Sequence, residues 1–313
     1  MKRSVLVLLA LLPIVLFPLE GLAVSPQLEI RDTVAIPPLT VDGVRISELS
    51  GLAWDQDEQL LYAVSDKGSI FHFRLALVDN RIKAVDPVYA AKLLDLDGCP
   101  LGKGKRDSEG LDVLNAANGR HGDTQLVISF EGTPRIVRFT PQGKAIAQVN
   151  FPGPISNRQA YRNGNKELES VTFHPRYGFI TAPELPLKGQ PINRHTLYSN
   201  KGQRWSFDAY PAENSGISDL ATLPDGNLLI LERAWSGIFN PLVVSLRYLD
   251  FSQCSKAGVC PVKDLKTLSS LFLVDNYEGL THIQGNQYLM VSDDNNEELL
   301  RTALTLFTLD LVK

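Results

Sequence analysis

Cysteine is scarce in this chain, and its scarcity limits the metal chemistry available. Five residues separate Cys254 from Cys260, so in an exported protein this pair could close a small disulfide loop at a hairpin tip. A zinc site would need more cysteine or histidine nearby than this segment offers. Cys99 is left over. Because no histidine lies close to it in sequence, we expect a partly buried thiol beside Pro100 rather than a nucleophile.

Familiar catalytic motifs are also missing. The sequence contains no Gly-x-Ser-x-Gly elbow, no His-Glu-x-x-His and no Gly-x-x-x-x-Gly-Lys. Serine-hydrolase chemistry is therefore disfavoured, although the same geometry can arise without that elbow. The five histidines show no metal-ligand spacing, and in strand-like runs a satisfied or exposed histidine is expected. They are His72, His121, His174, His195 and His282.

The chain has no cluster of basic residues either. It carries 31 basic and 35 acidic residues, a formal net charge of −4. Proteins that follow a nucleic-acid backbone need grouped Lys and Arg to neutralise phosphates. We therefore expect no nucleic-acid partner.

Only one apolar run in the sequence has the pattern of a targeting segment. A basic start at Lys2 and Arg3 precedes an apolar run over 5–19, and small residues end at Ala23. This pattern predicts a cleaved signal peptide over 1–23, a mature domain over 24–313, and a periplasmic or secreted protein. An uncleaved anchor is the alternative, but the run is short against the ~20 residues that span a bilayer. We expect no stable membrane insertion after cleavage.

Acidic residues recur in pairs along the chain, each pair enclosing a strand-like run. The pairs are Glu48 with Asp66, Glu109 with Glu131, Glu169 with Glu184, Asp219 with Glu232, and Glu278 with Asp293. Their first members lie 61, 60, 50 and 59 residues apart. Such a period indicates a repeated all-β unit.

Each unit offers short runs of β-branched and aromatic residues between turn residues, which predicts four antiparallel strands. The fifth unit has only three runs before the chain stops, and a run over 28–36 is available to complete it. We therefore predict an all-β, five-bladed propeller closed by its N-terminal strand. Six blades are the alternative if the loops at 98–108 or 152–167 hide strands. Both loops should overhang one mouth of the channel, and blade core is favoured for Trp54, Trp205 and Trp235.

Acids at the ends of inner strands should meet at one mouth of the channel. Like charges so close cannot all stay ionised unless a cation binds, and calcium takes six to eight oxygen ligands. The predicted calcium ligands are Glu48, Asp66, Glu109, Glu131, Glu169, Asp219, Glu232, Glu278 and Asp293. The alternative for each is a packing role, with the carboxylate bonded to backbone amides between blades.

Basic residues near the second acids could neutralise an anionic substrate; these are Lys67, Arg135 and Arg233. Strand neighbours point to opposite faces, so Lys67 and Arg233 could instead face away from the channel. A free carboxylate could act as a base beside the metal, and Glu109, Glu169 and Glu278 are the catalytic candidates.

Five segments of the chain resemble the phytase-like domain, the "esterase-like activity of phytase" family of exported bacterial propeller proteins. They are 64–68, 107–111, 216–233, 276–280 and 291–295, of which 216–233 and the Ser-Asp-Asp-Asn ending are specific. The resemblance implies ester or phosphoester hydrolysis. The chain departs from the family at Lys67, where Arg is frequent, and at Glu167 and Ser170.

Three functions follow as hypotheses. The first is a phytase-like or esterase-like hydrolase that acts on a small anionic or ester substrate at a calcium-binding mouth. The second is a non-catalytic binding propeller of the cell envelope, and the third is a lactonase-like enzyme, which Asn276 and Asn295 keep open. A monomer is favoured, although the sequence does not give the oligomeric state.

Overall fold

The computed structural model describes residues 26–311 except 165, 238, 272–273 and 296–299. The expected signal peptide over 1–23 lies outside these residues, and its cleavage site does too. No helix in the described ranges has the length and apolar character needed to cross a membrane.

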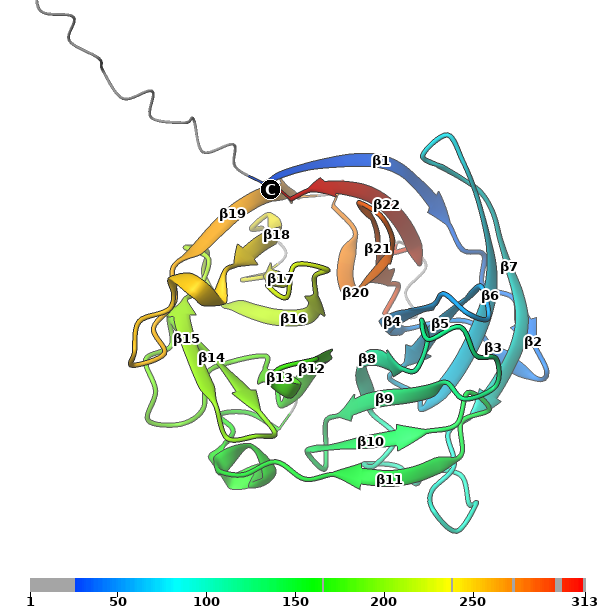
Figure 1. Cartoon of the computed structure of the whole chain (residues 1–313), viewed down its shortest axis with the longest axis horizontal. Coiled ribbons are helices and arrows are strands. Elements are labelled where there is room, and N and C mark those ends of the chain that lie inside the picture. Colours follow the sequence, from blue (N-terminus) through cyan, green and yellow to red (C-terminus); the bar gives the residue numbers. More distant parts are fainter. Residues whose placement is uncertain (1–25, 165, 238, 272–273, 296–299, 312–313) are drawn as a thin grey trace, which may run out of the picture.

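Five four-stranded antiparallel sheets surround a central channel, as Figure 1 shows looking along it. Blade 1 holds β4 (Leu49–Asp55), β5 (Leu60–Ser65), β6 (Ser69–Val78) and β7 (Arg81–Lys92). Blade 2 holds β8 (Ser108–Leu114), β9 (Gln125–Phe130), β10 (Arg135–Phe139) and β11 (Ala145–Val149). Blade 3 holds β12 (Leu168–His174), β13 (Gly178–Pro183), β14 (Arg194–Ser199) and β15 (Arg204–Asp208). Blade 4 holds β16 (Ser215–Thr222), β17 (Leu228–Ala234), β18 (Leu242–Leu249) and β19 (Val262–Ser270).

Blade 5 is built from both ends of the chain. It holds β20 (Asn276–Gln284), β21 (Gln287–Asp293), β22 (Ala303–Asp310) and, outermost, β1 (Gln27–Ala35). β1 pairs antiparallel with β22, and β20 contacts β4 of blade 1, so the ring is closed. The predicted five-bladed propeller with N-terminal closure is confirmed.

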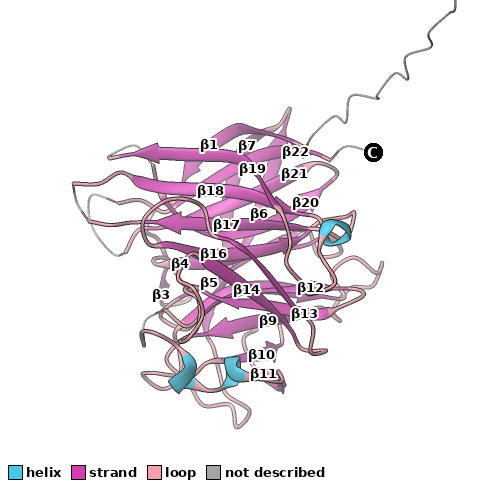
Figure 2. Ribbon diagram, turned by 90° about the vertical axis from the view of Figure 1, so that its left-hand side faces the viewer, coloured by secondary structure: helices cyan, strands magenta, loops and turns pink. Residues whose placement is uncertain are grey.

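The remaining described elements are short. A two-stranded hairpin, β2 (Thr40–Val41) and β3 (Val44–Arg45), lies beside blade 1, where it contacts β7. Three 3₁₀ turns complete the set: η1 (Pro154–Ser156), η2 (Arg158–Ala160) and η3 (Phe251–Gln253). The 3₁₀ turns are the helical segments visible in Figure 2. No sheet forms from the described residues of either long loop, so neither loop adds a blade and the six-bladed alternative is removed.

Apolar side chains fill the spaces between adjacent blades. Phe71 and Phe73 of blade 1, for example, share one cluster with Leu289 and Leu304 of blade 5. Burying each such side chain contributes roughly 1.5–3 kcal/mol. Trp54 and Trp205 belong to this core, as predicted, but Trp235 is 57% exposed and the core prediction for it is wrong.

Every inner strand carries a β-bulge at the same repeat position. One residue is left without a cross-strand partner in four of the blades, and in blade 2 both Glu109 and Gly110 are left without one. The bulged residues are Ser50, Glu109, Glu169, Ser218 and Glu278. A bulge adds a residue and redirects the side chain beside it.

The glycine after a bulge allows neighbouring inner strands to approach closely. A Cβ atom on Gly110 would lie 2.6 Å from Val171 N, and one on Gly279 would lie 3.0 Å from the Cα of Gly51. Backbone contacts this close leave no room for a side chain. The Glu-Gly pairs in blades 2 and 5 therefore reflect the narrowness of the ring.

The cysteines follow the prediction in part. Cys254 and Cys260 form a disulfide in the loop between β18 and β19. Cys99 is exposed rather than partly buried, because its loop turns outward around Asp95, whose carboxylate accepts the Cys99 N–H at 2.8 Å.

Candidate functional site: an acidic channel mouth

Three repeat positions face the mouth where the inner strands begin. The first position lies two residues before the bulged residue, and the second is the bulged residue itself. The third position lies at the end of the blade's second strand, one residue after the partner of the residue that precedes the bulge. In blade order the first position holds Glu48, Asp107, Glu167, Gly216 and Asn276. The second holds Ser50, Glu109, Glu169, Ser218 and Glu278, and the third holds Asp66, Glu131, Glu184, Arg233 and Asp293. Among these fifteen positions, blade 4 alone contributes no acid, and it contributes the only Arg.

Carboxylates from blades 2 and 3 come closest together. Their oxygens form two three-membered groups, each with its ligand atoms within 4.8 Å of one another: Asp107, Glu109 and Glu131, and Glu131, Glu169 and Glu184. Glu131 is common to both groups, and its carboxylate also accepts the backbone N–H of Glu167. The donors are all carboxylate oxygens, without histidine or cysteine, which suits a hard cation such as calcium.

Burial and mutual repulsion raise the pKa values of Glu109, Glu131 and Glu169. Burial, with the charges of Glu131 and Glu278 added, raises the pKa of Glu109 well above its usual value. Burial and the Glu109 charge raise the pKa of Glu169 in the same way. Burial raises the pKa of Glu131 to about 7, against the opposing effect of the Glu167 N–H. Without a cation the group therefore resists full ionisation.

Arg233 faces this mouth from blade 4. Its Nη1 donates to Asn276 Oδ1 at 2.6 Å and also to the Glu278 carboxylate, and its Nη2 lies 3.8 Å from Glu184 Oε1. Burial lowers the pKa of Arg233, but Glu278 and Glu184 outweigh burial and raise it above its usual value. A permanent positive charge thus lies beside acids of blades 3 and 5.

Asp219 and Glu232 do not join the site, which corrects two predicted ligands. Asp219 lies one residue after the bulge, and its carboxylate accepts the N–H groups of Leu220 (2.8 Å) and Leu280 (2.7 Å), linking blades 4 and 5. Glu232 lies one residue before Arg233 on the opposite face of the strand. These two acids fit the packing alternative.

Glu232 is fully buried between blades 3 and 4. Its carboxylate accepts from Arg247 Nη1 at 2.6 Å, Ser215 Oγ at 2.9 Å and Tyr210 N at 2.8 Å, and His195 Nε2 lies 3.4 Å away. Burial alone would raise the pKa of Glu232, but His195 and Arg247 lower it to about 2. Glu232 is therefore a buried ion-pair partner that stabilises the fold and does not contribute a carboxylate to the mouth.

The predicted ligands of blades 1 and 5 lie at the mouth but outside both three-carboxylate groups. Lys67 Nζ is 2.8 Å from Glu48 Oε1 and 3.2 Å from Asp66 Oδ2. The Glu48 N–H donates to Asp294 Oδ1 at 2.9 Å. Burial and the Glu278 charge raise the pKa of Asp293 to about 8.

Arg135 is not brought to the carboxylates. Its guanidinium donates to the backbone oxygens of Thr133, at 2.9 Å, and Lys105, and lies 4.1 Å from the centre of the Phe130 ring. These contacts hold the 98–108 loop against blade 2. The predicted substrate-binding role therefore has no support in its position.

Two loops overhang the mouth, as predicted. The 98–108 loop supplies Asp107. The 152–167 loop places Lys166 Nζ 2.6 Å from Glu184 Oε1 and Arg158 Nε 2.9 Å from Glu167 Oε1.

Asp107, Glu167 and Glu184 hold mouth positions but are absent from the predicted ligand set, although Glu184 is one of the paired acids. A usable signal existed in the apolar residues that start the predicted inner strands: Leu52, Leu111, Val171, Leu220 and Leu280. Counting back two residues from each gives the bulge position.

The far end of the channel is chemically different. A pocket of about 340 Å³ opens there, lined mainly by apolar side chains such as Leu52, Leu111 and Leu223. Asp112 is its acid, and its Oδ2 is occupied by Phe173 N and Thr172 Oγ1.

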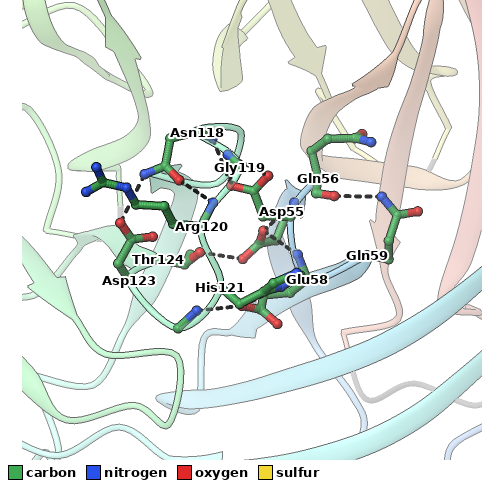
Figure 3. Close-up of polar contacts among 12 residues, drawn as sticks. Asp55, Gln56, Glu58, Gln59, Asn118, Gly119, Arg120, His121, Asp123 and Thr124 are labelled. Atoms are coloured by element: carbon green, nitrogen blue, oxygen red, sulfur yellow. Dashed lines mark hydrogen bonds and ion pairs between the residues drawn. The ribbon is translucent and has the colours of Figure 1, made fainter.

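A second group of acids lies where the β4–β5 turn meets the β8–β9 loop (Figure 3). Asp55 accepts from Thr124 Oγ1 at 2.6 Å, and Glu58 lies 3.4 Å from His121 Nδ1. Asn118 Nδ2 donates to Asp123 Oδ2 at 3.0 Å. The first two contacts join blade 1 to blade 2, the third lies within the β8–β9 loop, and His121 is paired with a single acid.

The sequence matches a family model over residues 44–296, and that family is described as Phytase-like, esterase-like activity of phytase. The chain belongs to this phytase-like family. The match covers all three mouth positions in every blade, so the acidic mouth is part of the phytase-like region.

Other comparisons are more distant. No curated protein matches this phytase-like chain. The PQQ-bound aldose sugar dehydrogenase from Streptomyces coelicolor is 12% identical, with a TM-score of 0.47 over 91% of this chain and 99% of that one. A putative oxidoreductase (glucose dehydrogenase) from Thermus thermophilus is 10% identical, with a TM-score of 0.44 over 90% of this chain and 100% of that one. Neither supports a functional assignment.

Proposed function

We propose that this phytase-like protein is a calcium-dependent hydrolase of a phosphoester or ester, with its site at the acidic mouth. The observation that carries the proposal is the pair of three-carboxylate groups that share Glu131. Their all-oxygen donor set fits calcium, and a divalent cation would relieve the repulsion that raises the pKa values of Glu109 and Glu169.

The ligands proposed for calcium are Asp107, Glu109, Glu131, Glu169 and Glu184. When bound, the ion supplies Lewis-acid polarisation of a phosphoryl or carbonyl oxygen and lowers the pKa of bound water. Glu131, which both groups share, would position the ligands of blade 2 relative to those of blade 3. Glu48, Asp66 and Asp293 would add negative charge without direct contact.

Glu278 is the proposed general base because it belongs to neither three-carboxylate group. Burial raises its pKa, against the lowering effect of Arg233, so its carboxylate is a better proton acceptor than an ordinary glutamate. Hydrogen bonds to Asn276 and Glu278 hold the Arg233 guanidinium where it can face an anionic substrate oxygen. Lys67 already pairs with Glu48 and Asp66, so it would attract an anionic substrate more weakly, from the blade 1 side of the mouth.

The enzyme proposal is tested with residues 24–313 purified free of metal. We expect turnover on a panel of phosphomonoesters, aryl esters and lactones to require added calcium. Glu278→Gln should lower kcat by roughly 10²–10⁴ while calcium still binds. Glu109→Gln should weaken calcium binding itself, measured by calorimetry, and Glu29→Gln on exposed β1 is the matched control. Absence of turnover across the panel, with calcium raising only the melting temperature, would instead identify a non-catalytic binding propeller.

Export is a separate proposal. It rests on the signal-like pattern over 1–23 and on the exported character that the family resemblance implies. N-terminal sequencing of the protein recovered from the cell exterior or periplasm should begin near Val24. Recovery of the intact N-terminus in the cytoplasm would contradict it.

A further inference from the structure

The loop over 235–241, between β17 and β18, exposes two aromatic side chains. Phe239 is 88% exposed and Trp235 is 57% exposed, the highest values among the aromatic residues described. Large apolar side chains so open to water are informative because folding normally buries them.

This loop rises from the candidate site. Trp235 is the first residue after β17, two residues beyond Arg233, so its Cα lies within about 7 Å of the Arg233 Cα. Loops at the same repeat position begin with the mouth acids Asp66, Glu131 and Glu184 in blades 1 to 3, and directly follow Asp293, the last residue of β21, in blade 5. Asn214 Nδ2, in the segment that leads into β16, donates to Trp235 O at 3.5 Å.

Apolar exposure continues onto blade 5. Leu271, just after β19, is 49% exposed, and Leu300, just before β22, is 37% exposed. The segments that carry them are joined by Arg301, whose Nε and Nη2 each lie 2.9 Å from an oxygen of Asp275. We call the four exposed side chains Trp235, Phe239, Leu271 and Leu300, which stand in the connections after β17, β19 and β21, the apolar rim.

The neighbouring blades carry basic side chains at the mouth. Lys67 in blade 1, together with Arg158 and Lys166 in the loop before blade 3, form ion pairs with acids there. Exposed aromatic side chains at the mouth are therefore found in the blade 4 loop, close in sequence to Arg233, while blades 1 and 3 contribute ion pairs. A ligand that is polar all round, such as a polyphosphorylated polyol, would leave the apolar rim unused.

We infer that the apolar rim binds a ring-containing apolar group on the substrate, whose phosphoryl or ester group lies at Arg233 and the carboxylates. This inference rests on the proposed function, and it names the substrate class: monoesters with an aromatic leaving group. Trp235 and Phe239 offer flat faces against which an aromatic ring can stack.

The test compares two phosphonates that share one head group and are not hydrolysed. With calcium present, phenylphosphonate should bind the wild-type protein about ten times more tightly than methylphosphonate, measured by calorimetry. In the Trp235→Ala, Phe239→Ala double variant the two affinities should fall within about twofold, through loss of phenylphosphonate binding alone. Val259→Ala, an exposed apolar residue in the β18–β19 loop, is the matched control and should keep the preference.

The outcomes separate this inference from the proposed function. Turnover of phosphomonoesters without any ring preference in binding would overturn the inference and leave the hydrolase intact. Ring preference without turnover on any ester would overturn the hydrolase and leave the rim as a ligand-binding surface. Equal phosphonate affinities, combined with vesicle binding that the double variant loses, would assign the rim to a membrane surface instead.

Discussion

Ser50 and Ser218 occupy the same bulge position in blades 1 and 4, yet their hydroxyls differ. Ser50 Oγ donates to Ser108 O at 2.6 Å, whereas buried Ser218 Oγ has no hydrogen-bond partner among the described residues. Ser50→Ala should lower the free energy of unfolding by about 1 kcal/mol. Ser218→Ala should leave it unchanged or raise it, because no hydrogen bond is lost. Urea denaturation of the metal-free protein measures both, and equal losses would contradict this assignment.

Glu131 and Glu232 are both buried acids, and their substitution should have opposite effects. Glu232→Gln removes the charge that compensates Arg247, so it should cost about 3–5 kcal/mol of folding stability while calcium binding in the surviving folded protein stays intact. Glu131→Gln removes a repelled carboxylate, so it should stabilise the metal-free protein and abolish tight calcium binding. Melting temperatures with and without calcium decide the matter. A Glu232 variant that folds normally but loses calcium would refute the structural role.

The contrast between these acids explains why the sequence identified the site only in part. Residue type and approximate period located Glu109, Glu169 and Glu278 at the mouth. A shift of one residue along a strand turns the side chain to the opposite face. A repeat period known to within one residue is therefore too coarse to tell which side chain faces the mouth. Asp219 and Glu232 were selected as acids, while their neighbours Ser218 and Arg233 hold the mouth positions.

At the scale of elements, the inner strands depend on close backbone approach. In Gly110→Ala the new Cβ would meet the backbone of blade 3, with Val171 N 2.6 Å away. We expect a loss of about 1–3 kcal/mol in unfolding free energy from this overpacking. Gly102→Ala is the control, since nothing lies within 4 Å of its Cβ position. Chemical denaturation of both variants should separate them clearly, and comparable stabilities would disprove the steric argument.

Strand positions were predictable to different degrees for physical reasons. Runs such as 125–130, 135–139 and 242–249 agree with the observed strands because each is a short run rich in apolar residues between polar or turn residues. Inner strands start three to five residues earlier than predicted, for example at Leu49 rather than Leu52. The bulge interrupts alternation there, and a pattern search stops at the interruption.

At the scale of the molecule, the five blades repeat the same architecture, but blade 4 differs from the others in the residues it places at the mouth. Five equivalent blades supply the mouth, and four of them bring acids while blade 4 brings Arg233 and the aromatic loop. The fivefold count followed from repeat length and the spare N-terminal strand. The asymmetry depends on which residue each blade places at the three mouth positions. The pairing register of the first and second strands of each blade determines which residues these are.

Titration of the mouth should appear in the stability of the whole metal-free protein. Burial is the main cause that raises the pKa of Glu131 to about 7 and that of Asp293 to about 8. An acid with a raised native pKa holds its proton more tightly when folded, so its favourable contribution is complete below its unfolded pKa and is lost as pH rises through the native value. Stability should therefore fall across this window.

The useful window lies between about pH 6.5 and 8. Below it, His72 and His282 act in the opposite direction, because burial lowers the pKa of each and acid then favours unfolding. Within it, the free energy of unfolding should drop by about 1.4 kcal/mol per pH unit for each proton that the native state still holds and the unfolded state has released. Calcium should flatten this decline, since bound carboxylates are ionised in the native state, and its stabilising effect should grow with pH. Glu131→Gln should make the metal-free decline shallower; an unchanged slope would mean that the mouth acids titrate normally.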